Sequence, residues 1–98
     1  MTSLPQLEIH HDAHAGRFEA QVAGGRAECV YRLQGSLMNI VHTEVPAVAE
    51  GRGIAAALVQ AALAHARAVG WRVRPSCSYV RTYMRRHPET QDLLEAPS

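Results

Sequence analysis

The sequence has no lysine, since all ten of its basic residues are arginine. Without lysine, Schiff-base catalysis and a phosphate-binding Walker loop are excluded. The chain also has little net charge, because ten basic and nine acidic side chains leave +1 at pH 7. That balance favours neither a nucleic-acid-binding nor a membrane-binding protein.

Cysteines and long apolar runs are also scarce. Cys29 and Cys77 are too few for a secreted disulfide framework. The longest uncharged apolar stretch, residues 53–64, is far shorter than the roughly 20 residues that a membrane span needs. Residues 1–12 lack the basic and apolar regions of a signal peptide. We therefore expect a cytoplasmic protein with reduced thiols and no membrane or nucleic-acid partner.

Hydrophobic residues, by contrast, are plentiful enough for one core. They make up 47% of 98 residues, which predicts a single domain over residues 1–98. The first half alternates apolar and polar residues, as strands do. Expected strands cover residues 7–11, 17–22, 27–33 and 37–45. Short turns between them, including Gly24-Gly25 and Gly35-Ser36, predict a four-stranded antiparallel meander.

The second half changes character. Residues 54–69 contain eight alanines and no glycine or proline, which predicts a helix that ends at Gly70. A strand over residues 71–75 and a helix over residues 78–86, with Ser78 as a possible N-cap, follow. Residues 89–94 are expected to add a final turn. The fold class is α/β (α+β): a meander followed by helix, strand and helix, with the helices packed on the sheet.

A glycine-rich turn joins the last meander strand to the long helix. It reads Glu50-Gly51-Arg52-Gly53-Ile54-Ala55. Glycine permits positive φ and close backbone approach, and a helix start presents free N–H groups with roughly half a positive charge. Such a turn suits an anion such as phosphate.

Three interpretations of this turn remain open. The dinucleotide pattern G-x-G-x-x-A fits Gly51, Gly53 and Ala56, but Arg72 and Arg74 stand where an acidic residue is expected. The turn also fits the pyrophosphate loop of an acyl-CoA-binding protein. Alternatively, it is a helix entry that binds nothing.

Several spaced motifs favour the acyl-CoA interpretation. They are His42-Thr43-Glu44-Val45-Pro46, Glu50-Gly51-x-Gly53-Ile54-Ala55, Pro75-x-Cys77-x-Tyr79-Val80, Tyr83 and His87-Pro88-Glu89. Over residues 17–94 the chain resembles the GNAT superfamily of acetyl-CoA-dependent N-acetyltransferases. Within it, the chain is similar to very small single-domain proteins of the N-acetyltransferase domain-containing protein 1 type. Glu50 departs from the arginine or glutamine usual in that loop.

The resemblance implies a minimal GNAT-like fold and transfer of an acetyl group from acetyl-CoA to an amine. It implies a cofactor held along residues 38–45, with the thioester between the diverging strands 37–45 and 71–76. The implied cofactor-binding residues are Val45, Glu50, Gly51, Arg52, Gly53, Ile54, Ala55 and Cys77. The acceptor amine is unknown, with a protein as one candidate, and we expect a monomer or weak homodimer. Because the chain is shorter than a full GNAT domain, the acceptor side of the site is expected to be open.

The catalytic candidates are Cys77, His42, Tyr79 and Tyr83. Cys77, at a predicted helix start, should have a lowered pKa and act as acyl relay or general acid, or else be a small core residue. Tyr79 and Tyr83 share a helical face, so either is a candidate acid or a packing residue. His42, on one strand face with Glu44, is a candidate base or part of an outward polar face.

Other charged side chains carry less information. Arg81, Arg85 and Arg86 either meet the adenosine phosphates of the cofactor or form a solvated face. His10, His11 and His14 lack a completing ligand, so no metal site is expected. Two alternatives to an enzyme remain: a CoA-binding module without catalysis, and a small nucleotide-phosphate-binding domain.

Overall fold

The computed structural model describes residues 7–95. The first six residues, part of the segment searched for a signal peptide, and the last three lie outside this range. Within residues 7–95 the sheet has five strands in the order β1-β2-β3-β4-β5. The elements are β1 (His10–Asp12), β2 (Arg17–Val22), β3 (Gly25–Gln34), β4 (Leu37–Glu44), α1 (Ile54–Val69), β5 (Arg72–Pro75) and α2 (Ser78–Arg86). Short 3₁₀ turns cover Ala47–Ala49 and Pro88–Leu93.

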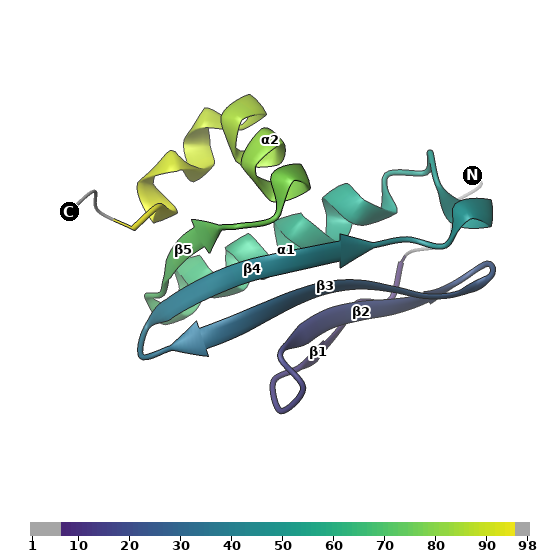
Figure 1. Ribbon diagram of the computed structural model, residues 1–98, viewed down its shortest axis with the longest axis horizontal. Coiled ribbons are helices and arrows are strands. Elements are labelled where there is room, and N and C mark those ends of the chain that lie inside the picture. The colour runs from purple at the N-terminus through teal and green to yellow at the C-terminus, as the bar shows by residue number, and fades with distance from the viewer. Residues whose placement is uncertain (1–6, 96–98) are drawn as a thin grey trace, which may run out of the picture.

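The predicted α/β class and the meander followed by helix, strand and helix are confirmed. Strands β1 to β4 pair antiparallel with their neighbours, and β5 pairs parallel with β4. Figure 1 shows the four strands of the meander followed by α1, β5 and α2. This mostly antiparallel sheet is unlike the parallel sheet of a dinucleotide-binding domain.

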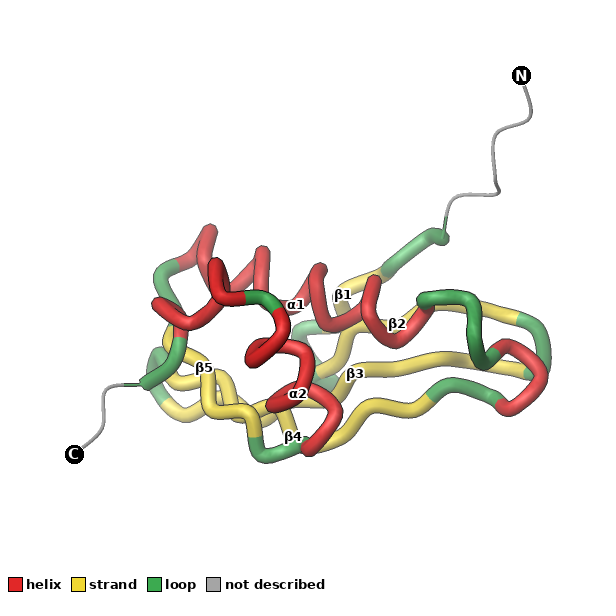
Figure 2. Tube along the Cα trace, turned by 90° about the horizontal axis from the view of Figure 1, so that it is seen from above, coloured by secondary structure: helices red, strands yellow, loops and turns green. Residues whose placement is uncertain are grey.

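One hydrophobic core lies between the sheet and the two helices, which lie side by side (Figure 2). It is built from alternate residues of the strands, such as Phe18 and Ile40, and from one stripe of each helix, such as Leu58 and Val80. Burial of these side chains is the main force that holds the helices on the sheet. The described residues include no helix long and apolar enough to cross a membrane.

Strand β4 contains a bulge that changes which of its side chains face the core. Val30 of β3 pairs with His42, whereas its neighbour Tyr31 pairs with Ile40, so Val41 is an extra residue. Met38 and Ile40 face inward before the bulge. After it, Thr43 faces inward opposite the buried Cys29. The parity of the strand is thus reversed over its last residues.

The predicted boundaries needed several small corrections. Strand β1 begins at His10 rather than at residue 7. Leu33, expected inside with Cys29 and Tyr31, is 45% exposed near the end of β3. Trp71 precedes β5, because its N–H bonds the Ala66 carbonyl in the turn that closes α1. Gly70 has φ of +82° there, as expected of a helix stop.

Candidate functional site

The site begins where β4 and β5 separate. Their parallel pairing ends at Ile40 and Pro75, and the N–H of Cys77 donates to the Ile40 carbonyl. The chain then turns into α2, while β4 continues to Glu44. Beyond Ile40, no described strand pairs with β4 on this side. Its backbone N–H and C=O groups are therefore free to pair with an extended ligand, as strand edges do.

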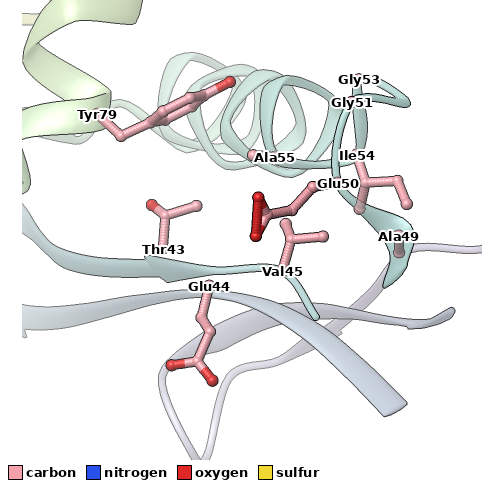
Figure 3. A pocket seen from close by; sticks show the side chains of 10 residues that line it. All are labelled: Thr43, Glu44, Val45, Ala49, Glu50, Gly51, Gly53, Ile54, Ala55 and Tyr79. Carbon is pink, nitrogen blue, oxygen red and sulfur yellow. The ribbon is translucent and has the colours of Figure 1, made fainter. Parts of the chain in front are cut away.

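A pocket of about 530 Å³ lies between this free stretch of β4 and the start of α1. We call it the α1-entry pocket. Ten residues line it: Thr43, Glu44, Val45, Ala49, Glu50, Gly51, Gly53, Ile54, Ala55 and Tyr79. Figure 3 shows Thr43 and Val45 pointing into it from the strand. Its volume is within the usual range of small-molecule sites, and its walls are largely apolar.

The helix entry has the backbone geometry that the glycines predict. Gly51 and Gly53 have φ of +79° and +75°, a region that disfavours residues with a side chain. Gly53 is the N-cap of α1 and provides no side-chain hydrogen bond. The first N–H bonded back to it is that of Ala57. The preceding N–H groups, among them those of Ile54 and Ala55, lack intrahelical partners and suit an anion.

Cys77 lies at the other end of the free stretch of β4 and is partly exposed. It is the N-cap residue of α2, so Ser78, expected to be the cap, is the first residue of the helix. The Cys77 sulfur is 3.6 Å from the Thr43 hydroxyl oxygen. Partial burial opposes ionisation. The Thr43 hydroxyl, the N–H groups of Val80 and Tyr79 and the Arg81 charge outweigh it and lower the pKa of Cys77.

Cys29 shows the opposite behaviour. It is fully buried opposite Thr43 on the neighbouring strand, and this burial raises its pKa to about 12. Although both thiols lie near the same threonine, only Cys77 combines partial exposure with a lowered pKa.

The two tyrosines of α2 occupy different surroundings. Tyr79 is 41% exposed and lines the α1-entry pocket. Tyr83 does not border that pocket; its ring stacks on His87, with centroids 3.9 Å apart. Both border a second hollow between α1 and α2. Burial, followed by the Glu89 and Tyr79 charges, raises the pKa of Tyr83.

His42 and Glu44 share a face of β4, as predicted, but it is the face away from the core. The bulge at Val41 turns them outward, and His42 Nε2 is 2.9 Å from Glu44 Oε1. The His42 side chain is 52% exposed. Glu44 borders the α1-entry pocket, yet its carboxylate points away from it (Figure 3). The structure therefore does not bring His42 together with Tyr79 in the pocket.

Most of the predicted cofactor-binding residues line the pocket together. Val45, Glu50, Gly51, Gly53, Ile54 and Ala55 do so. Arg52 does not, because it is an exposed residue of the turn. Cys77 is connected to the pocket through Thr43, a lining residue that sequence reasoning missed. Strand alternation alone would have placed Thr43 outside.

The remaining charged candidates lie elsewhere. The guanidinium of Arg81 donates to the carbonyls of Pro75 and Ser76, so it closes the turn before α2. Arg86 borders the hollow between the helices, whereas Arg85 is an exposed residue of α2. Among residues 7–95 no three His, Cys, Asp or Glu side chains gather as metal ligands would.

Comparison with known proteins places this chain in a family. Residues 17–93 match the family model described as GCN5-related N-acetyl-transferase. The chain is 31% identical to protein NATD1 of Gallus gallus over 90 residues, which cover 89% of this chain and 82% of that protein. Identity is likewise 31% to human protein NATD1, over 89% of this chain and 80% of that one.

A solved structure agrees with this assignment. It is a solution NMR structure of a GCN5-like protein from Staphylococcus aureus, which is 26% identical to the chain and superposes with a TM-score of 0.74. The match covers 97% of this chain and 94% of that one. The family expected from the sequence motifs is therefore confirmed, and the chain belongs to the GCN5-related N-acetyltransferase family.

Proposed function

We propose that the protein is an acetyl-CoA-dependent N-acetyltransferase that holds its cofactor in the α1-entry pocket. The observation that carries this proposal is the continuity of three features. The free stretch of β4 suits an extended pantetheine, the entry to α1 suits a pyrophosphate, and Cys77 and Tyr79 flank the point where β4 leaves β5. Acetyl-CoA supplies an acetyl thioester, which is an activated acyl donor.

The residues of the chain have distinct roles in this proposal. The N–H groups of Ile54 and Ala55 hold phosphate oxygens, and Val45 packs beside the pantetheine. Tyr79, the one tyrosine that lines the pocket, is the general acid for the departing CoA sulfur. Cys77, with its lowered pKa, is the alternative acid or the acyl relay.

The acceptor is an amine, which must be uncharged to attack the thioester. His42 is exposed on the outer face of β4. It can therefore serve as base only for an amine that approaches from that face. Its pairing with Glu44 at 2.9 Å would orient the ring for this task.

A second candidate function is a CoA-binding module without catalysis. No histidine is among the residues lining the α1-entry pocket. A cofactor cradle without a histidine base in its lining is also compatible with binding alone. The two candidates share the ligand and differ only in chemistry.

Mass spectrometry of the natively purified protein, followed by an acetyl transfer assay, separates them. We expect co-purified CoA or acetyl-CoA in the native spectrum. We also expect CoA thiol release from acetyl-CoA in the presence of an amine, with a loss of roughly 100-fold in Tyr79→Phe. An acetyl adduct on Cys77 would identify the relay. CoA binding with the same basal turnover in Tyr79→Phe, Cys77→Ala and His42→Ala would leave only the binding module.

A further inference from the structure

The charge that lines the α1-entry pocket has the wrong sign for the cofactor. Its lining residues include two glutamates, Glu44 and Glu50, and no arginine. A pyrophosphate held there would meet backbone N–H groups, but no lining residue would offer it a cationic side chain. The electrostatic balance of the pocket therefore depends on where the two carboxylates point.

Figure 3 shows that the two carboxylates point in opposite directions. Glu44 extends beneath β4, away from the pocket. Glu50 reaches into the pocket, between Val45 on the strand and Ala55 on the first turn of α1. Its carboxylate thus lies near the free N–H groups of the helix start, where negative charge is favoured.

Glu50 is not held there by a cation. Among residues 7–95 it forms no ion pair, and it is exposed to solvent. Its neighbour Arg52 lies outside the pocket lining. The carboxylate can therefore rotate away, but while it stays it occupies the region that an incoming phosphate needs and repels that phosphate.

We propose that Glu50 is an intramolecular competitor for the phosphate position and so sets the cofactor affinity and charge preference of the pocket. This inference rests on the proposed cofactor site. Glu50 disfavours ligands in proportion to the negative charge they place at the start of α1. It does not disfavour the uncharged pantetheine portion of the ligand.

The test compares Glu50→Gln with Glu8→Gln, a control that removes the same charge from an exposed residue outside the pocket lining. Isothermal titration calorimetry measures Kd for CoA and for pantetheine, which lacks the phosphates, at low salt and at about 1 M salt. In a water-like surrounding, repulsion between one carboxylate and two phosphate charges a few ångströms away raises the Kd about ten-fold. The thermal midpoints of both variants are measured to verify folding.

We expect Glu50→Gln to lower the Kd for CoA about ten-fold at low salt, and high salt to remove most of that gain. Its Kd for pantetheine, and both Kd values of Glu8→Gln, should stay within about two-fold of the parent. Equal CoA affinity in all three proteins, or weaker binding in Glu50→Gln, overturns the role of Glu50 and leaves the cofactor site intact. A lack of CoA binding in every protein overturns both.

Discussion

At the scale of single residues, two thiols that lie near one threonine differ in their pKa. Cys77 sits at a helix start with a lowered pKa, and Cys29 lies in the core with a pKa of about 12. The difference follows from position rather than from residue type. A thiol near N–H groups and a hydroxyl is stabilised as a thiolate, and one surrounded by apolar atoms is not.

Alkylation by iodoacetamide near neutral pH should therefore modify Cys77 at least about 100-fold faster than Cys29. Because only the thiolate reacts, the Cys77 rate should rise with pH and level off above its lowered pKa. Peptide mass spectrometry over a time course measures both rates. Thr43→Val removes the hydroxyl beside the sulfur and should slow modification of Cys77. Equal rates for the two thiols would contradict the assignment.

The two tyrosines of α2 likewise differ in their surroundings. Tyr79 lines the α1-entry pocket, whereas Tyr83 stacks on His87. If Tyr79 protonates the departing sulfur, Tyr79→Phe should lower kcat by roughly 100-fold and leave the Kd for CoA nearly unchanged. Tyr83→Phe, which removes a matched hydroxyl one turn away, should alter kcat by less than about three-fold. A larger loss of kcat in Tyr83→Phe than in Tyr79→Phe would contradict the assignment of Tyr79 as the general acid.

At the scale of elements, the entry to α1 combines a structural and a binding requirement. Gly53 has a positive φ, and a Cβ built on it meets no described heavy atom within 4 Å. Gly53 is also one of the residues that line the α1-entry pocket. A side chain there costs backbone strain at the helix start, where the proposed cofactor would be held.

Gly53→Ala should accordingly lower the free energy of unfolding by about 1–2 kcal/mol and weaken CoA binding about ten-fold. Gly35→Ala is the matched control, because Gly35 also has positive φ and open space around a built Cβ but lies in the turn between β3 and β4. Denaturant unfolding should show similar losses in both variants. Calorimetry should show weaker binding in Gly53→Ala alone; weaker binding in Gly35→Ala would mean that strain, not position, is responsible.

The elements also show how far sequence reasoning reaches. The bounds of β2, α1 and α2 were predicted correctly, because alternation, alanine content and Gly70 are strong local signals. The bulge at Val41 was not predicted, because an extra residue is visible only in the pairing with β3. That one residue turned His42 outward and Thr43 inward. Side-chain direction in a turn, as at Arg52, likewise has no local signal.

At the scale of the whole molecule, the short edge strand β1 is joined to the core by an aromatic cluster. The His11 ring stacks on Phe18 at 4.0 Å and shares a 2.6 Å hydrogen bond with the Tyr31 hydroxyl. His65 of α1 meets His11 edge-on at 4.5 Å and lies beside Trp71. The cluster thus links the first strand, the middle of the sheet and the long helix.

This cluster should make stability depend on pH. Burial, followed by the nearby His65 charge, lowers the pKa of His11 below 6.5, with Asp12 opposing and His10 adding to the shift. At a pH between the pKa of His11 in the folded chain and its higher pKa in the unfolded chain, the unfolded chain binds more protons than the folded one. The free energy of unfolding should therefore fall as pH drops below about 6.5. The lowered pKa values of Asp12 and Asp92 act in a separate window, below about pH 3.8.

Urea unfolding between about pH 7 and pH 5 measures this dependence. His11→Phe keeps an aromatic ring against Phe18 without a titrating group, so its curve should be flatter than that of the parent. His14→Phe changes an exposed histidine and should leave the slope unchanged. Parallel curves for the parent and His11→Phe would show that His11 does not control acid stability.

The central claim is that the start of α1 and the free stretch of β4 hold CoA. Amide NMR spectra recorded during a CoA titration test it most directly, because each backbone N–H reports its own surroundings. The structure predicts saturable shifts at Gly51, Gly53, Ile54 and Ala55 and at the end of β4, with Gly35 unaffected. Spectra that do not change at millimolar CoA, or that change only away from the α1-entry pocket, would contradict it.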